Sequence, residues 1–298
     1  MNQATEQPKV AILYIALGRY IVFWKDFFES CEEKLLSCEK HYFIWTDCPP
    51  EELEHGNNSR VTIIPTQKRG WPYDSLMRFD MFLQKKEEIL QCDYAFFFNA
   101  NMMFYNPTDL SEIAPHEWNE GLVAGAHPGL LKRKIYLKNP DEHSYERRAE
   151  STAYIPFGSG KHYVCGAFNG GTSKAFVHMC EVLKENVQKD LDNGIVACVD
   201  DESHLNAYMS QHNYLFLGIT YGFPEKELKH LGRSGHKNMI KIISRQKSHP
   251  KYGGLKYLRG KRNTKMSSGE YVVLKTLKLL CGIIPVRTWR RKVKSKLL

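Results

Sequence analysis

The sequence predicts an α/β protein with a mainly parallel sheet flanked by helices, followed by a basic C-terminal helical tail. Three observations support this fold class. Short apolar runs alternate with helix-periodic segments over the first hundred residues, their order demands crossover connections, and basic residues are concentrated near the C-terminus. With 298 residues, 42% of them hydrophobic and 25% charged, the chain can bury a sizeable core. This composition excludes a disordered chain, a collagen and a disulfide-stabilised miniprotein.

The N-terminal third contains four candidate strands and two candidate helices. The strands are Val10–Ala16, His41–Thr46, Val61–Pro65 and Tyr94–Phe98, each rich in β-branched or aromatic residues. One helix is expected where Phe23, Phe27, Phe28, Cys31 and Leu35 recur at roughly helical spacing, and the other over Asp74–Leu90. A continuous apolar strand such as Val10–Ala16 is typical of a sheet covered on both faces.

Strand ends in such a sheet indicate where a ligand binds, because ligands of parallel α/β sheets lie at the carboxyl ends of the strands. Those ends carry 15–20, Thr46-Asp47 and 99–101. No GxGxxG follows the first strand, and no GxxxxGK[ST] occurs in the sequence. A dinucleotide dehydrogenase and a P-loop ATPase are therefore poorly supported.

The second half is less regular. We expect a short strand over Gly121–Ala126, a basic polar loop over Lys132–Pro140 and a strand over Tyr163–Gly171 that turns at its glycines. Helices are expected over Ser173–Gln188, capped by Ser173, and over Val199–Met209, where acidic residues suit a helix N-terminus.

Charge is distributed unevenly. From Lys226 onward there are 21 Lys and Arg against Glu227 and Glu270, a net charge of +19, whereas residues 1–225 carry −10. An anionic partner and a solvated tail both explain this asymmetry. Val286, Trp289, Val293 and Leu297 recur at spacings of three and four among basic residues, as in a helix on an anionic membrane surface; a helix docked on the body is the rival interpretation.

The expected location is cytoplasmic, with peripheral contact to the inner face of the cell membrane. The N-terminus lacks the pattern of a signal peptide, and the apolar runs are too short to span a bilayer. The eight cysteines form no CxxC or zinc-like spacing, so free thiols in a reducing compartment are expected.

Two polar clusters are candidates for chemistry. Asp200-Asp201-Glu202 crowds three carboxylates, whose mutual repulsion raises some of their pKa values; one of them could serve as a nucleophile or base, or all could simply start a helix. Asn99-Ala100-Asn101 closes an aromatic strand, as either a polar turn or a weak ligand-binding site, because neutral amides hold a hard cation poorly. Tyr145-Glu146-Arg147-Arg148 indicates local ion pairs, or less readily phosphate or sugar binding.

Six strings in order resemble glycosyltransferase family 6, the family of the histo-blood-group A and B transferases and the α-1,3-galactosyltransferase. They are GWPYDSLMRF (70–79), DYAFFFNANMMF (93–104), AHPGL (126–130), SYERRAESTAYIP (144–156), HYVCGAFNGG (162–171) and DDESHLNAY (200–208). The resemblance runs from about Val10 to Arg259. It implies a GT-A fold, which is Rossmann-like, for a catalytic domain at 1–264, with the basic amphipathic tail at 265–298.

The resemblance also implies a retaining transfer of galactose or N-acetylgalactosamine from a UDP-sugar, in α-1,3 linkage, to a galactose-containing oligosaccharide or glycolipid, fucosylated or not. Animal members carry Asp-x-Asp and need manganese. Asn99-x-Asn101 instead resembles the metal-independent bacterial branch, so no metal cofactor is expected. No nucleic-acid partner is expected either.

Site roles follow from the resemblance by position. Glu202 is implied as the catalytic carboxylate, which also meets the acceptor, and His127 as an acceptor contact. The donor-binding positions implied are Ile15, Leu17, Tyr20, Trp71, Arg78, Asn99, Asn101, Cys165, Gly166, Ala167, Asp201, Lys247 and Arg259. Val199-Asp200 departs from the Trp-His that the family usually has before its Asp-Glu pair. Ala167 slightly favours galactose because its methyl group narrows the space for an acetamido group.

These features lead to one mechanistic expectation. Without a metal, fixed cations must neutralise the departing diphosphate, and Arg78, Lys247 and Arg259 are the candidates. Glu202 would stabilise the oxocarbenium-like sugar. The alternatives are a catalytically impaired relative that binds a sugar nucleotide or glycan, and a nucleic-acid-binding module.

Overall fold

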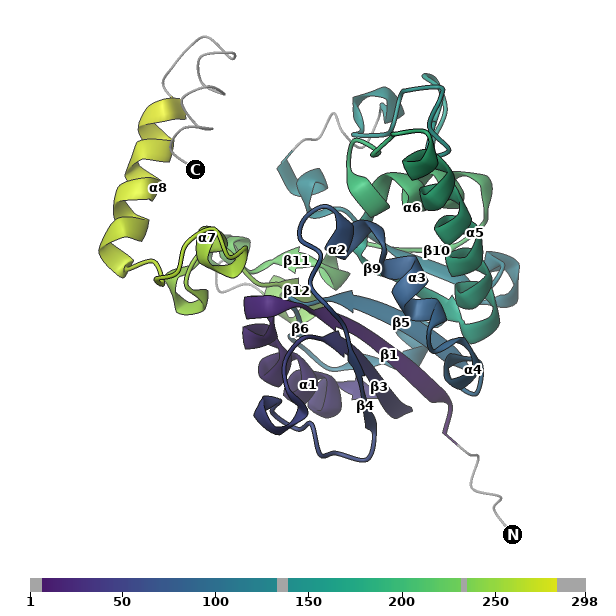
Figure 1. The fold of residues 1–298 in the computed structure, drawn as a ribbon, viewed down its shortest axis with the longest axis horizontal. Coiled ribbons are helices and arrows are strands. Elements are labelled where there is room, and N and C mark those ends of the chain that lie inside the picture. Colours follow the sequence, from purple (N-terminus) through teal and green to yellow (C-terminus); the bar gives the residue numbers. More distant parts are fainter. Residues whose placement is uncertain (1–6, 133–138, 232–234, 283–298) are drawn as a thin grey trace. The chain divides into compact units, whose positions relative to one another are not determined.

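The computed structural model describes residues 7–132, 139–231 and 235–282 (Figure 1). The chain divides into two compact units, Met1–Arg245 and Gln246–Leu298. We call them the catalytic unit and the C-terminal unit. The sequence-based boundary at 264/265 remains a prediction.

The element bounds follow the expected alternation closely in the first third of the chain. The strands of the catalytic unit are β1 (Lys9–Ala16), β2 (Leu35–Leu36), β3 (Glu39–Thr46), β4 (Val61–Pro65), β5 (Tyr94–Asn99), β6 (Met102–Phe104), β7 (Thr108–Asp109), β8 (Leu122–Ala126), β9 (Val164–Thr172), β10 (Leu215–Leu217), β11 (Phe223–Pro224) and β12 (Ile242–Ser244). Its α-helices are α1 (Trp24–Lys34), α2 (Tyr73–Leu76), α3 (Arg78–Leu83), α4 (Lys86–Ile89), α5 (Ser173–Asp192) and α6 (Asp200–Gln211).

The central sheet has the strand order β10-β8-β9-β5-β1-β3-β4. β1 pairs in parallel with β3 and β5, β3 with β4, and β8 with β10, whereas β9 runs antiparallel to both of its neighbours. A small sheet, β11-β12-β6, accompanies it. The prediction of a mainly parallel sheet flanked by helices is therefore confirmed, and the arrangement is consistent with a GT-A-like fold.

Helices cover both faces of this sheet because adjacent strand residues point to opposite sides. In β5, Phe97 packs on Phe82 of α3 with ring centroids 5.2 Å apart, and Phe82 packs on Phe176 of α5 at 5.7 Å. The next residue, Phe98, packs on Phe27 of α1 at 5.6 Å. Burial on both faces explains why this strand is nearly all aromatic.

The helix expected over Asp74–Leu90 is instead three short helices, α2, α3 and α4. The break at Met77, whose backbone leaves the helical region, separates α2 from α3. In α3 the adjacent residues Arg78 and Phe79 are both buried, at 4% and 1% exposure. One straight amphipathic helix buries a single stripe, whereas the break lets the Arg78 guanidinium turn inward beside an apolar neighbour.

Two further expectations are corrected around β9. Gly170 and Gly171 form no turn but continue the strand, where added Cβ atoms would lie 2.4 Å from the Ala95 carbonyl oxygen and 2.0 Å from that of Gly121. The glycines therefore permit close approach of neighbouring strands. The helix cap is Thr172 rather than Ser173, because the Thr172 hydroxyl accepts from the Ala175 N–H.

The C-terminal unit contains α7 (Leu255–Leu258) and α8 (Ser268–Gly282). The amphipathic pattern from Val286 to Leu297, and most of the basic loop 132–140, lie outside the described residues. Within the part of the chain that is described, no helix combines the length and apolar character needed to cross a membrane.

Candidate active site

Polar residues gather where β1, β5 and β8 end and β9 begins. The β1–β5 register pairs Ile15 with Asn99, and His127 follows directly after β8. Asn206 of α6 binds both backbone groups of Val164, the first residue of β9: its Oδ1 accepts from the Val164 N–H, and its Nδ2 donates to the Val164 carbonyl, both at 3.0 Å. The same Nδ2 donates to the Glu202 carbonyl at 2.8 Å, so this amide fixes the first turn of α6 against β9.

Glu202, in that first turn, has both carboxylate oxygens occupied. Its Oε1 accepts from the Tyr163 hydroxyl at 2.8 Å, and its Oε2 accepts from the Gly166 N–H at 2.7 Å. The side chain is 13% exposed. Two directed donors hold the carboxylate in one orientation.

His127 faces Glu202 across a short gap. Its Nδ1 accepts from the Gly129 N–H at 3.0 Å, so the neutral ring carries its proton on Nε2. That Nε2 lies 3.9 Å from Glu202 Oε1, too far for a hydrogen bond. A substrate hydroxyl placed beside both could accept from His127 and donate to Glu202.

Arg78 and Asp201 form a buried pair below this gap. Arg78 Nη2 lies 2.7 Å from Asp201 Oδ2, and its Nη1 donates to the Gly166 carbonyl at 2.6 Å. Nε of Arg78 is buried and lacks a hydrogen-bond partner within the described part of the chain. Arg78 therefore has an unused donor.

Burial affects the pKa of Asp201 more than this ion pair does. Burial raises that pKa to about 6, while the charge of Arg78 lowers it and the charge of Glu202 raises it further. Burial also raises the pKa of Asp200, opposed by the nearby indole N–H of Trp71. The expectation that some pKa values in this cluster rise is confirmed, but burial, not mutual repulsion, is the first cause.

The asparagine cluster is arranged differently. Asn101 is buried, and its Nδ2 donates to the Ser244 Oγ at 2.9 Å and to the Arg245 carbonyl at 2.8 Å. Asn99 ends β5 and is half-buried. Neutral amides, one of them holding β12, do not fit the hard divalent cation that the fold family often uses.

A second possible donor set also fits a metal poorly. His127, Cys165 and Glu202 offer ligand atoms that all lie within 4.8 Å of one another. His127 Nε2 is the protonated nitrogen, however, so the imidazole offers no lone pair toward Glu202 while its Nδ1 accepts from Gly129. These three residues therefore form a poor metal-binding site.

Comparison with known proteins decides the family. Residues 2–253 match the model of glycosyltransferase family 6. The chain belongs to glycosyltransferase family 6. It is 31% identical over 249 residues to the O-antigen biosynthesis glycosyltransferase WbnI of Escherichia coli, which covers 83% of this chain and 99% of that protein.

Animal relatives are also similar. Histo-blood group ABO system transferase 2 of Rattus norvegicus is 28% identical over 68% of this chain and 59% of its own length. Globoside alpha-1,3-N-acetylgalactosaminyltransferase 1 of Homo sapiens is 29% identical over 67% and 56% respectively. The chain thus spans little more than half the length of these animal relatives. As a family 6 member it is a glycosyltransferase that uses a nucleotide-sugar donor and a glycan acceptor.

The structure of this family 6 glycosyltransferase brings together Arg78, His127, Cys165, Asp201 and Glu202. In β9, Gly166 faces the Arg78–Asp201 pair, and its half-buried neighbours Cys165 and Ala167 point to the other side of the strand. Lys247 and Arg259 lie in the C-terminal unit, and their roles at this cluster remain predictions.

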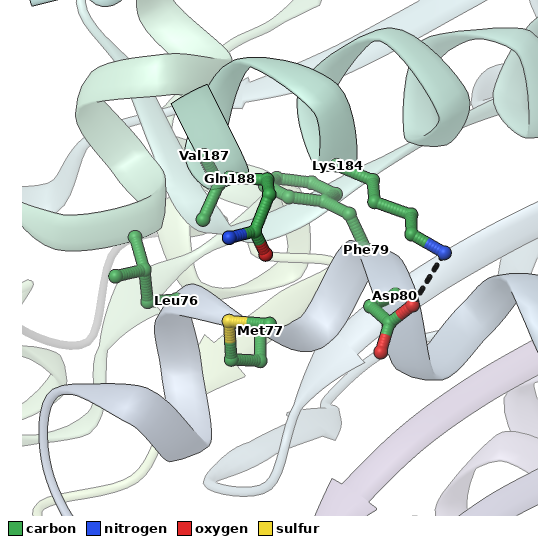
Figure 2. A pocket seen from close by; sticks show the side chains of 7 residues that line it. All are labelled: Leu76, Met77, Phe79, Asp80, Lys184, Val187 and Gln188. Carbon is green, nitrogen blue, oxygen red and sulfur yellow. Dashed lines mark ion pairs between the residues drawn. The ribbon is translucent and has the colours of Figure 1, made fainter. Parts of the chain in front are cut away.

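Four of the predicted donor-binding residues, at positions 15, 17, 20 and 71, differ in exposure. Leu17 is buried within the main core cluster, whereas Ile15 and Tyr20 are half-buried, and Trp71 is 73% exposed. Their roles remain predictions. A hollow of about 70 Å³ between α3 and α5, crossed by the Asp80–Lys184 ion pair, contains none of the predicted site residues (Figure 2).

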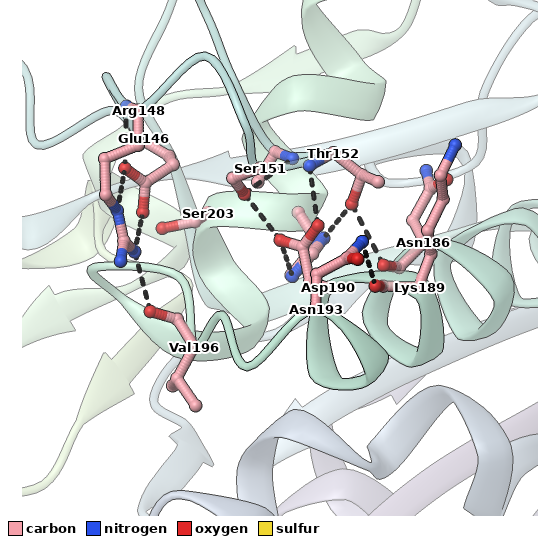
Figure 3. A network of polar contacts seen from close by, with 12 residues as sticks. Glu146, Arg148, Ser151, Thr152, Asn186, Lys189, Asp190, Asn193, Val196 and Ser203 are labelled. Carbon is pink, nitrogen blue, oxygen red and sulfur yellow. Dashed lines mark hydrogen bonds and ion pairs between the residues drawn. The ribbon is translucent and has the colours of Figure 1, made fainter.

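Sequence reasoning missed the residues that hold α6, the helix that carries Glu202. Glu146 does form a local ion pair with Arg148, as expected (Figure 3). Its Oε2 also accepts from the Cys198 N–H at 2.7 Å. Arg148 in turn donates to the Val196 carbonyl at 2.7 Å. The loop before α6 is thereby fixed, and α6 carries Glu202.

A second buried acid completes this network. Asp190, at the end of α5, accepts from the Thr152 N–H at 2.7 Å and from the Ser151 hydroxyl at 2.5 Å. Because the segment 146–152 binds both helices, it joins the end of α5 to the start of α6. The only available signal was that Glu146 and Ser151 fall within one of the six strings; Tyr163 was likewise quoted without a role.

Proposed function

We propose that the protein transfers galactose or N-acetylgalactosamine from a UDP-sugar, in α-1,3 linkage and with retention, to a galactose-containing glycan or glycolipid without a divalent metal. The name of the globoside relative, an alpha-1,3-N-acetylgalactosaminyltransferase, supports the linkage and the sugar class. The observation that carries the proposal is Glu202, held by two donors and facing the His127 Nε2–H across 3.9 Å.

In this mechanism, the carboxylate of Glu202 stabilises positive charge on the sugar as its bond to UDP breaks. Both Glu202 oxygens accept hydrogen bonds, which lowers their nucleophilicity. This favours charge stabilisation over a covalent sugar–enzyme intermediate, with the acceptor attacking on the face that UDP leaves.

The acceptor would bind through His127. Its Nε2–H would donate to the galactose hydroxyl oxygen and orient it, while the hydroxyl proton passes to an oxygen of the departing diphosphate or to Glu202. Transfer to the diphosphate neutralises charge on the leaving group, whereas transfer to Glu202 leaves that charge to be balanced by the fixed cations.

Fixed cations replace the metal in the proposal. Arg78 lies beside Glu202 across Gly166, and the proposal requires Lys247 and Arg259 to approach the diphosphate as well. The neutral amides of Asn99 and Asn101 support metal independence because they supply no carboxylate to a cation.

The deciding experiment is a glycan acceptor array with UDP-Gal and UDP-GalNAc, run in EDTA and again with manganese. We expect transfer in EDTA at the rate seen with manganese, and an α-configured product by NMR. The matched Glu202→Gln protein should give no product. Activity that depends on manganese would overturn metal independence, and absence of transfer or UDP release with either donor would indicate a non-catalytic relative.

A further inference from the structure

The C-terminal unit combines an exposed apolar helix with strong positive charge. In α8, Val272 is 60% exposed and Val273 is 58% exposed. The unit contains 15 Lys and Arg against one acid, Glu270, a net charge of +14 over 53 residues. Exposed apolar residues within a strongly charged surface indicate an interaction site.

The first turn of α8 is fixed by contacts within its unit. Glu270 pairs with Arg262 at 2.9 Å and accepts from the Ser267 N–H at 2.8 Å. The Tyr271 hydroxyl accepts from Gln246 Nε2 at 2.6 Å, and its ring packs on His249. Beyond Tyr271 the helix continues with exposed valines, so its first turn is held while the following apolar surface is left uncovered by the described residues of its own unit.

Charge decides which partner fits this surface. A second copy would bring another unit of +14 against the first, which opposes self-association. A nucleic acid would match the charge but would leave the apolar valines in water. An anionic bilayer satisfies both, since its headgroups attract Lys and Arg while the apolar side of a helix enters the acyl boundary.

We propose that the C-terminal unit docks on an anionic lipid surface, with α8 lying in the interface and its Val272–Val273 side inserted. Exposed lysines of the same unit, Lys256, Lys261 and Lys265, contact the headgroups. This inference does not use the sugar chemistry, because none of these residues is assigned a role in binding the donor or the acceptor.

Co-sedimentation of the full chain with vesicles tests it. Binding is expected to vesicles of phosphatidylcholine with phosphatidylglycerol, and to fall steeply with added salt. Pure phosphatidylcholine should bind the protein weakly. Equal binding to neutral and anionic vesicles, or no binding to either, would overturn the proposal.

Two variants separate the apolar and charged contributions. Val272→Asp with Val273→Asp should weaken partitioning into the vesicles about a hundredfold, because the two valines that insert into the bilayer are lost. Lys256→Glu with Lys261→Glu and Lys265→Glu should weaken it more than tenfold on anionic vesicles. The matched control is Leu36→Asp, which changes a leucine 42% exposed in β2 of the catalytic unit and should leave binding unchanged.

Circular dichroism and the midpoint of urea unfolding verify that each variant is folded. Unchanged vesicle binding by the double valine variant contradicts insertion of α8. A dimer by light scattering that the same variant abolishes, without vesicle binding by the parent protein, would identify a second copy as the occupant and also overturn the proposal.

Discussion

Two polar clusters of the catalytic unit, Asn99–Asn101 and Asp200–Glu202, differ in charge and in what their side chains do. In the first cluster, the buried amide of Asn101 donates to the Ser244 hydroxyl and to the Arg245 carbonyl, and these bonds support β12. In the second, a carboxylate is held by two donors and faces a histidine across a gap. The charged side chains of this site therefore lie at the start of α6 rather than at the end of β5.

The largest effect should come from Glu202→Gln. We expect kcat to fall by about three orders of magnitude or more, because the neutral amide cannot stabilise a developing cation. Donor affinity should change little. Steady-state kinetics and calorimetric UDP binding measure these two quantities.

The control for that experiment is Glu185→Gln on the exposed side of α5, which should leave both quantities unchanged. If Glu202→Gln retained near-normal turnover, the second cluster would not be the charged centre, and the contrast between the clusters would fail.

The next effect concerns pH and the Arg78–Asp201 pair. Because burial raises the pKa of Asp201 to about 6, protonation below that pH removes the ion pair, and kcat/KM should fall as the pH drops through about 6. The free energy of unfolding should respond in the opposite sense. A carboxyl whose folded pKa is raised stabilises the protein when protonated, and this contribution is lost as pH rises through about 6.

Asp201→Asn tests both consequences. This variant should show low activity without that acidic limb, and urea unfolding at pH about 5 and about 7 should no longer reflect this group. An unchanged acidic limb in Asp201→Asn would assign the titration to another residue.

A smaller effect is expected from Tyr163→Phe. Loss of the hydroxyl that donates to Glu202 Oε1 should lower kcat about tenfold, since hydrogen bonds to charged groups contribute about 1.5–3 kcal/mol. KM should change less than kcat. Tyr154→Phe, at a tyrosine 37% exposed, is the matched control. A larger change in KM than in kcat would mean that Tyr163 acts mainly in substrate binding.

The smallest effect on catalysis, and a clear one on stability, should come from the asparagines. Asn101→Asp replaces a donor amide with a carboxylate facing the Arg245 carbonyl, which should lower the free energy of unfolding by about 1–3 kcal/mol. Asn99→Asp should lower the free energy of unfolding far less. Urea denaturation compares them, and equal stability of the two variants would show that the Asn101 contacts do not support β12.

Much of the fold was predictable because apolar runs in a doubly covered sheet are unmistakable. The runs at Val10–Ala16, Val61–Pro65 and Tyr94–Phe98 became β1, β4 and β5 with bounds within about one residue. The break at Met77 was not predictable, because periodicity could not reveal that a buried arginine would turn toward Gly166 and Asp201.

The candidate site was predictable only in part. The resemblance supplied Glu202, Asp201, Arg78 and His127, which the structure brings together. It could not supply the tether of Asn101 to β12 or the reach of Glu146 to the Cys198 N–H, because both join residues more than fifty positions apart in the sequence.

The tight surroundings of Gly166 limit how this site could be redesigned. An added Cβ would lie 3.1 Å from Asp201 Oδ2, 3.3 Å from Arg78 Nη2 and 3.3 Å from Glu202 Cβ. Any larger side chain there would press on all three residues at once. Libraries that aim to change the sugar accepted by the enzyme should therefore keep this glycine and vary Cys165 and Ala167, whose side chains leave the other face of the strand.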